Sequence, residues 1–336
     1  APVRGDIEGV ELEGVHELRT LEDARGLREA ISTDVRRVVV VGGGYIGLEA
    51  AEALHHLGRE VTVVTSGTHV LERALDQEMG ERVVSAMGKM GINVRTGMPI
   101  RCLEGSGGRV RSVGCEGEDF PADLVLLGLG TRPEVELAEE AGIPLGETGA
   151  IGVDERQRTG VEGVWSAGDC AEAHHRVSGR PANIHLGTVA NKAGRVAGIN
   201  LGGGDATFPG VLGTAITRVC ELEVARTGLG LVEAQQAGIS AVAEVATGTT
   251  TAGYWPQASE MAIMTVVEQG SDRLLGAQIV GGPGAGKRVD VFATALWNGM
   301  TAGDLAWVDL AYAPPFSGVW DLIHIAARQG SEAAGN

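Results

Sequence analysis

Residues 38–54 read VVVVGGGYIGLEAAEAL, and this stretch decides the fold of the region around it. The four valines at its start are typical of a strand that is buried on both faces of a parallel sheet. Glycines with the spacing G-x-G-x-x-G follow, and then comes an alanine-rich segment with helical character. We expect this helix to end at Gly58 and a second strand to cover residues 60–64. The stretch therefore predicts the first half of a βαβ unit that binds a dinucleotide.

Each glycine of this loop has its own physical role. Gly42 allows a tight turn, Gly44 lets the backbone approach a pyrophosphate, and Gly47 lets the helix pack closely on the strand. The helix then begins at Tyr45 and Ile46, where free N–H groups and the positive end of the helix dipole favour phosphate. The alternative is a purely structural glycine turn, but the strand before the loop and the helix after it favour a nucleotide site.

The bulk composition narrows the function classes. A chain of 336 residues suggests two or three domains, and its net charge of −17 argues against nucleic acid or an anionic membrane as partner. No apolar stretch approaches the roughly 20 residues needed to span a bilayer, and the first residues lack the apolar core of a signal peptide. These features favour a cytoplasmic protein.

Cysteine and histidine usage gives no sign of a disulfide scaffold or a metal site. The four cysteines lie far apart and form no C-x-x-C, and the adjacent histidine pairs do not share a helix face. We therefore expect no metal, a reducing setting and no catalytic cysteine among Cys102, Cys115, Cys170 and Cys220.

The periodicity of the remaining chain predicts three regions. The first alternates helices and strands, which indicates an α/β fold with a parallel sheet covered on both faces. The second has one clear helix, and the third has strands followed by helices, an α+β pattern. The expected helices are 20–31, 76–90 and 188–200, the expected strands are 92–96 and 124–129, short antiparallel strands fall within 105–121, and a polar tail follows residue 328.

Four blocks in order carry a resemblance to a known family. They are GGGYIGLEAAEAL at 42–54, TGVEGVWSAGDCAEA at 159–173, residues 186–203 with TRVCELEVARTGLG at 217–230, and DLAYAPPFSGVWD at 309–321. With these blocks the chain resembles the flavin-dependent pyridine nucleotide–disulfide oxidoreductases. Within that family it is most similar to the coenzyme A disulfide reductase, NADH oxidase and NADH peroxidase group.

The resemblance implies a Rossmann-like NAD(P)-binding domain, the returning part of an FAD domain and a C-terminal α+β dimerisation domain. It also implies that the leading part of the FAD domain, with its own glycine fingerprint and the redox cysteine, lies outside this chain, because only one fingerprint is present. The expected boundaries are 1–13 for a remnant of the FAD domain and linker, 14–133 for the nucleotide domain, 134–208 for the FAD part, 209–330 for dimerisation and 331–336 for a tail.

The resemblance also implies FAD as cofactor and assigns residues to it. Asp169 would hydrogen-bond the flavin ribityl chain; the alternative is a turn aspartate that caps the next helix. The helix that begins at Leu186, Gly187 and Thr188 would point its positive end at the flavin, and the alternative is an ordinary packing helix. Tyr45 would lie over the flavin or, alternatively, in the core.

On the nicotinamide side, Glu49 lies one helical turn beyond Tyr45, and Gly130 ends the strand 124–129. Thr65 stands where an acid normally binds the ribose hydroxyls of NAD, and no arginine stands at 65–68 to bind a 2′-phosphate. The sequence therefore leaves NADH and NADPH open, with a slight preference for NADH.

Two tyrosines complete the implied site. Tyr312 and Tyr254 match tyrosines that act near the substrate thiol from the partner subunit, and interface packing is the alternative. The glycine-rich run at 281–288 nearly fits a phosphate-binding loop, but Arg288 stands where that loop requires Ser or Thr.

The function expected from the resemblance is an NAD(P)H-dependent FAD flavoprotein oxidoreductase that acts as a homodimer through 209–330. It would reduce a disulfide such as coenzyme A disulfide, a peroxide or oxygen. Two alternatives remain: a flavin reductase that serves an electron-carrier protein, and a dinucleotide-binding or dimerising module without catalysis.

Overall fold

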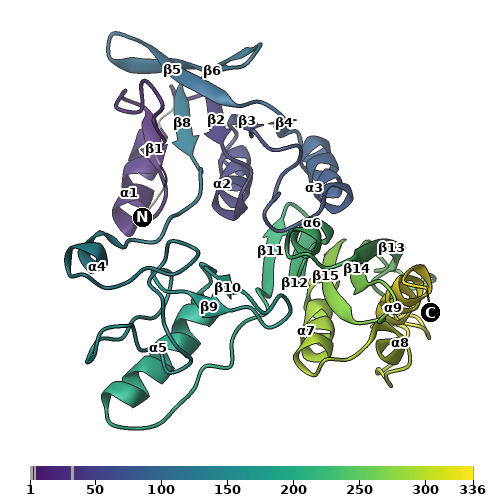
Figure 1. Ribbon diagram of the computed structural model, residues 1–336. Coiled ribbons are helices and arrows are strands. Elements are labelled where there is room, and N and C mark those ends of the chain that lie inside the picture. Colours follow the sequence, from purple (N-terminus) through teal and green to yellow (C-terminus); the bar gives the residue numbers. More distant parts are fainter. Residues whose placement is uncertain (1–2, 4, 32–33, 336) are drawn as a thin grey trace.

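The computed structural model describes residues 3, 5–31 and 34–335 of the chain. Figure 1 shows three regions. The nucleotide region, expected at 14–133, is purple and blue, the loop-rich region 134–208 is mainly teal, and the C-terminal region from residue 209 is green and yellow. The first and the last each contain a five-stranded sheet. The two regions expected to be α/β and α+β thus have those architectures.

The first sheet is parallel and has the strand order β1-β8-β2-β3-β4. Its central strand β2 buries the valines 38–41 on both faces, as their β-branched side chains require. Helices α2 and α3 cover one face. The bounds are β1 Val15–Glu17, α1 Leu21–Ala30, β2 Arg37–Val41, α2 Tyr45–His56, β3 Glu60–Val64, α3 Gln77–Met90, β4 Asn93–Arg95 and β8 Leu124–Leu127.

An antiparallel three-stranded sheet covers the other face of the parallel sheet. Its strands are β5 Ile100–Ser106, β6 Arg109–Cys115 and β7 Asp119–Pro121. The turn between the first two contains Gly107 and Gly108, both at positive φ. The pairing begins at Ile100, five residues before the stretch 105–121 in which short antiparallel strands were expected.

The loop-rich region 134–208 consists mostly of loops around one long helix. It contains α4 Glu136–Glu140, the short strands β9 Ala173–His174 and β10 Pro181–Ala182, and α5 Gly187–Leu201. Its core is small and includes Ala193, Val196 and Phe208. Few apolar contacts therefore hold α5 in this region.

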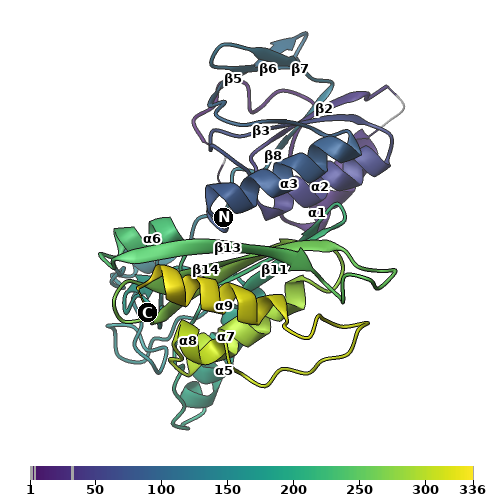
Figure 2. The same ribbon diagram turned by 90° about the vertical axis from the view of Figure 1, so that its right-hand side faces the viewer.

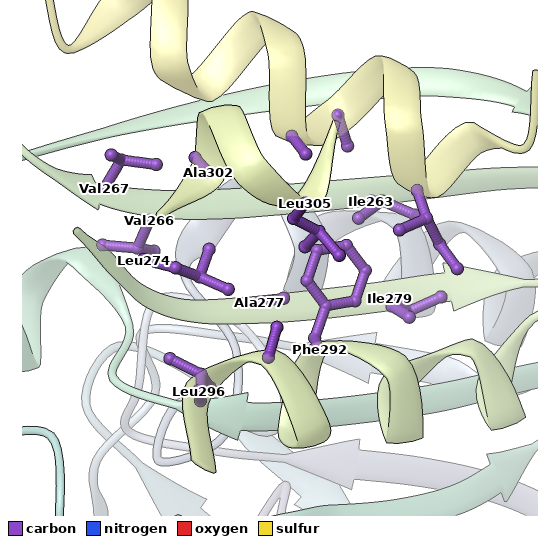
Figure 3. Packing of buried hydrophobic residues seen from close by; sticks show 14 of the residues in the cluster. Ile263, Val266, Val267, Leu274, Ala277, Ile279, Phe292, Leu296, Ala302 and Leu305 are labelled. Carbon is purple, nitrogen blue, oxygen red and sulfur yellow. The ribbon is translucent and has the colours of Figure 1, made fainter. Parts of the chain in front are cut away.

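The C-terminal sheet is antiparallel with the order β11-β12-β15-β14-β13. Figure 3 shows its core, in which Phe292 and Leu305 pack against Ile263 and Ile279 of the sheet. The bounds are β11 Ala215–Val219, β12 Leu222–Gly228, α6 Leu231–Gln236, β13 Ala241–Thr249, β14 Glu260–Glu268, β15 Leu274–Gly281, η1 Gly286–Arg288, α7 Val289–Trp297, α8 Ala302–Leu305 and α9 Leu322–Ala333.

The prediction of a polar tail after residue 328 is wrong. Helix α9 continues to Ala333, and Ala334 is buried. Ala326, Ala327 and Gly330 form a small-residue face that lets the helix lie close on β14, where the hydroxyl of Thr265 donates to the carbonyl of Ala326. Polar residues on the outer face hid this pattern in the sequence.

Helices α2 and α3 form a layer between the parallel sheet and the C-terminal sheet. Figure 2 shows α2 and α3 lying over the C-terminal sheet, with α9 on its far side. One apolar cluster joins Leu54, Met79 and Val83 of the nucleotide region to Ala262 and Met264 of the C-terminal sheet. The nucleotide region is thus fixed on the C-terminal sheet by burial of apolar surface.

Candidate cofactor and substrate site

The glycine loop has the close packing that its sequence predicts. Gly42 has φ +113°, and a Cβ there would overlap the carbonyl oxygen of Gly128. A Cβ on Gly47 would overlap the carbonyl oxygen of Gly42. Both positions therefore accept only glycine, because α2 starts in contact with the ends of β2 and β8.

Gly44 differs from these two glycines. It is the N-cap of α2 at an ordinary φ of −84°, it is exposed, and a Cβ there would meet nothing within 4 Å. The N–H groups of the first turn, from Tyr45 onward, have no partners within the helix. Space above Gly44 and a helix N-terminus without a side-chain cap fit the pyrophosphate of a dinucleotide.

Hydrogen bonds fix the loop that follows β3. The N–H of Thr65 donates to the carbonyl of Arg95 at 3.0 Å, and its own carbonyl accepts from Met98 at 2.9 Å. The N–H of Gly97 donates to the carbonyl of Gly67 at 2.7 Å. The structure places Thr65 beside Gly43, where a Cβ would lie 3.4 Å from that of Thr65.

Tyr45 and Glu49 point toward the C-terminal sheet. Tyr45 is half-buried, and burial raises the pKa of its phenol while the charge of Arg226 opposes the rise. Glu49 is exposed, and its carboxylate accepts a 2.6 Å hydrogen bond from the hydroxyl of Thr217 on β11. Glu49 therefore connects the fingerprint helix to the C-terminal region.

Asp169 lies in a loop held by several polar contacts. Its carboxylate lies 3.8 Å from the guanidinium of Arg19. The amide of Asn183 donates to the carbonyls of Asp169 and Ala171, both at 3.0 Å. These bonds fix the backbone and leave the carboxylate of Asp169 partly exposed, which suits an acceptor for ligand hydroxyls.

Helix α5 begins at Gly187, one residue earlier than expected, with Leu186 as its N-cap. Leucine offers no capping side chain, so the first N–H groups of the helix, including that of Thr188, remain available to an outside acceptor. The positive end of a 15-residue helix therefore faces outward at this point.

His185, just before this helix, joins the two halves of the site, and the sequence reasoning missed it. Its Nδ1 lies 2.5 Å from the hydroxyl of Thr131, and its Nε2 lies 2.6 Å from Oδ1 of Asn183. Burial lowers the pKa of His185, and the charge of Asp169 partly opposes this. The pairing with Thr131, 54 residues away, leaves no local sequence signal.

A continuous path of contacts thus runs through the site. The glycine loop touches Gly128 at the end of β8, and Gly130, at φ +93°, accepts from the N–H of Val3 at 2.9 Å. Thr131 then reaches His185, and Asn183 holds the Asp169 loop. The fingerprint, the Asp169 loop and the N-terminus of α5 are therefore parts of one connected arrangement.

The structure brings Tyr254 and Tyr312 together on the surface of the C-terminal region. Both are exposed, and the partial loss of water around Tyr312, together with the neighbouring Tyr254 phenol, raises the pKa of Tyr312. Arg288 holds the two segments, since its Nη2 donates to the carbonyls of Thr250 at 2.8 Å and Phe316 at 2.9 Å. Sequence reasoning noticed Arg288 only as the residue that spoils a phosphate loop.

The glycine-rich run at 281–288 binds the carboxylate of Glu223. The N–H groups of Gly284 and Gly286 donate to Glu223 at 3.1 and 2.7 Å. The run therefore uses its backbone donors to attach β12.

The thiols of Cys115 and Cys220 are poor nucleophiles. Burial raises the pKa of Cys220 to about 11, and burial also raises the pKa of Cys115. Such thiols stay protonated at neutral pH. Within residues 3, 5–31 and 34–335, no cluster of three or more His, Cys, Asp or Glu side chains has metal-site geometry, and no helix is long and apolar enough to cross a membrane.

Comparison with known proteins matches both halves of the chain to one protein family. The family model of the pyridine nucleotide-disulphide oxidoreductases matches residues 1–194, and the family model of their dimerisation domain matches residues 214–322. The two matched segments contain the glycine loop and the tyrosine pair, respectively.

Individual relatives are similar over nearly the whole chain. An NAD(P)H coenzyme A polysulfide/persulfide reductase of Pyrococcus horikoshii is 40% identical over 96% of this chain and 72% of its own length. A coenzyme A disulfide reductase of Staphylococcus epidermidis is 32% identical over 92% of this chain and 69% of its own length.

The solved structure of an NAD-dependent persulfide reductase from A. fulgidus superimposes with a TM-score of 0.94 at 40% identity. The match covers 99% of this chain and 62% of that chain. This chain therefore spans less than two thirds of the solved structure it matches.

Proposed function

Because the chain belongs to the pyridine nucleotide-disulphide oxidoreductases, we propose that it serves in an NAD(P)H-dependent FAD flavoenzyme that reduces sulfur–sulfur bonds of small thiol compounds. The net reaction would convert NAD(P)H, a proton and a disulfide into NAD(P)⁺ and two thiols, or the same reductant and a persulfide into NAD(P)⁺, one thiol and hydrogen sulfide. Coenzyme A disulfide and coenzyme A persulfide are the favoured substrates, because relatives at 32% and 40% identity are named for them.

One observation carries this proposal. The dinucleotide loop, the loop that carries the Asp169 carboxylate and the N-terminus of α5 are joined through the Thr131–His185 hydrogen bond. A single nucleotide site would need only the first of these. A carboxylate for hydroxyl groups and a helix dipole for negative charge suit a second, flavin-type ligand beside it.

The residues of this chain would bind and orient the reactants. The Gly44 loop would hold the pyrophosphate of the nicotinamide cofactor, and Asp169 would accept hydroxyl hydrogen bonds from FAD. The bound flavin supplies the two-electron chemistry between the nicotinamide and the acceptor. The N-terminus of α5 would stabilise negative charge, and Tyr45 would shield the space between the two ligands from water.

We propose further that the chain acts as a homodimer through residues 209–330, in which Tyr254 and Tyr312 serve the partner's site. Support comes from the dimerisation-domain match and from an exposed apolar surface that includes Trp307, Phe316 and Val319. A phenol pair can donate a proton to a departing thiolate. A cytoplasmic location is proposed as well, since all four cysteines are free thiols.

The test is an anaerobic assay of the protein in its natural, full-length form, supplied with FAD. We expect visible flavin absorbance and oxidation of the nicotinamide cofactor when coenzyme A disulfide or persulfide is added. Each cofactor oxidised should yield two thiols from the disulfide, or one thiol and one hydrogen sulfide from the persulfide. Turnover only with oxygen or peroxide would replace the proposed acceptor. Protein that takes up neither flavin nor nicotinamide cofactor would favour a dimerising module without catalysis.

A further inference from the structure

The sequence has no acid at the end of β3, where a carboxylate normally receives the ribose hydroxyls of NAD. Thr65 occupies that position and is followed by Ser66 and Gly67. A neutral end of β3 would leave the site without a means of telling a ribose 2′-hydroxyl from a 2′-phosphate. The structure brings a carboxylate to this place from a later turn.

That carboxylate belongs to Glu72. The N–H of Leu71 donates to the carbonyl of Gly43 at 2.7 Å, so the turn that carries Glu72 is attached directly to the glycine loop. The side chain of Glu72 folds back over the end of β3, where a Cβ on Gly67 would overlap its Oε2. The N–H of Thr68 lies 3.4 Å from Oε1.

The surface that receives Glu72 is rigid. The loop after β3 is held by Gly97 and Met98, whose N–H groups donate to the carbonyls of Gly67 and Thr65. Glycine at position 67 leaves the space that the carboxylate occupies. The arrangement therefore presents an exposed carboxylate at a fixed place beside the glycine loop.

The residue that follows Glu72 is basic, and it is Arg73. The carbonyl of Arg73 accepts from Arg226 at 2.8 Å, which fixes the backbone one residue after Glu72. The loop after β3 thus has a carboxylate beside it, and none of residues 65–68 is basic.

We propose that Glu72 is the residue that makes this site select NADH over NADPH. The inference rests on the proposed nucleotide function of the Gly44 loop. The Glu72 carboxylate accepts hydrogen bonds from the ribose hydroxyls of NADH, and it repels the 2′-phosphate of NADPH. Glu72 thereby replaces, from seven residues further along, the acid that is absent at Thr65.

Calorimetric titration of the purified chain with NADH and with NADPH tests this inference directly. We expect the chain to bind NADH about tenfold or more tightly than NADPH, and Glu72→Gln to remove most of that difference. Glu81→Gln is the matched control, since it removes the same charge from an exposed position on α3. In the Glu72→Gln background, Thr65→Asp should restore the preference for NADH.

The outcomes separate this inference from the proposed function. If the chain binds both nucleotides and Glu72→Gln keeps the ratio of the two dissociation constants, Glu72 does not select and the nucleotide site still stands. Equal affinity of the unaltered chain for both nucleotides, or tighter binding of NADPH, overturns the inference in the same way. Binding of neither nucleotide overturns the nucleotide site together with it.

Discussion

The carboxylate of Asp76 accepts a hydrogen bond from the backbone N–H of Leu231, 2.9 Å away, although 155 residues separate them. Asp76 is the N-cap of α3, yet its side chain makes no cap bond there. It caps α6 of the C-terminal region and also accepts from the amide of Gln278 at 2.5 Å. The start of α3 is therefore anchored to the C-terminal sheet.

Replacing Asp76 should weaken this connection. We expect Asp76→Ala to lower the free energy of unfolding by about 2 kcal/mol, because α6 loses its cap and Gln278 loses a charged partner. Urea unfolding followed by circular dichroism measures the change. Glu78→Ala, at an exposed position on the same helix, should cost less than about 0.5 kcal/mol. Equal losses in the two variants would contradict a special role for Asp76.

The ion pair of Arg288 and Asp321 gives a second prediction. Both side chains are about nine-tenths buried, and the guanidinium also donates to the carbonyls of Thr250 and Phe316. Arg288→Met should destabilise the protein by about 3–5 kcal/mol, because it leaves a carboxylate buried without its partner. Thermal unfolding measures the loss.

A double-mutant cycle separates the ion pair from the other contacts of Arg288. The combination of Arg288→Met with Asp321→Asn should cost less than the sum of the single changes, since the second change removes the stranded charge. Asparagine can still cap α9, as Asp321 does through the N–H of Ile323. Strictly additive losses would show that the pair contributes nothing of its own.

The local elements could be predicted from the sequence, while the contacts between distant segments could not. The valine strand, the glycine loop and the helix expected at 76–90 follow from residues a few positions apart, and the structure contains all of them. These features depend on backbone geometry and on apolar periodicity. They need no knowledge of the tertiary fold.

The missed residues share one physical cause. Glu72 reaches the end of β3 only because the N–H of Leu71 binds Gly43, and His185 meets Thr131 only after the regions have folded. Polar side chains that pair across such separations have no periodicity to reveal them. The roles expected for Asp169, Thr188 and the tyrosine pair stay predictions, since they concern ligands and a partner subunit.

Acid should weaken the nucleotide sheet through Asp123. This carboxylate accepts from the N–H groups of Arg36 and Arg37 and from the guanidinium of Arg37, which lowers its pKa from 3.8 to about 2. Because the pKa in the folded state is lower than in the unfolded state, the stabilisation is present above pH 3.8 and is lost as the pH falls through about 2.

Asp123→Asn isolates this contribution. We expect the variant to be about 1–2 kcal/mol less stable than the unaltered chain near neutral pH, a value reduced for the partial exposure of Arg37. The difference should shrink between about pH 5 and pH 2 in urea unfolding series. Asp119→Asn, at a half-exposed ion pair with Arg101, should show a smaller effect. A difference that stays constant with pH would refute the assignment.

The exposed aromatic surface predicts how the dimer can be disrupted. Trp307 is 78% exposed and Phe316 is 73% exposed, although both are apolar. Trp307→Glu with Phe316→Asp should convert a dimer to a monomer in sedimentation velocity, because charges would be buried at the interface. Circular dichroism should show an unchanged fold. A monomeric unaltered chain would instead remove this surface as the interface.

Gly44 and Gly47 should respond differently to the same substitution, although both belong to the fingerprint. Gly47→Ala should destabilise the protein by about 2 kcal/mol or more, because its Cβ would overlap the carbonyl of Gly42 within a packed contact. Gly44→Ala should change stability by less than about 1 kcal/mol, since its φ is ordinary and nothing lies within 4 Å of the new methyl group. Its affinity for NADH should nevertheless fall about tenfold or more, because the methyl group occupies the space proposed for the pyrophosphate. Calorimetric titration and thermal unfolding of the two variants measure these effects independently. Unchanged NADH affinity in a stable Gly44→Ala variant would remove Gly44 from the nucleotide site.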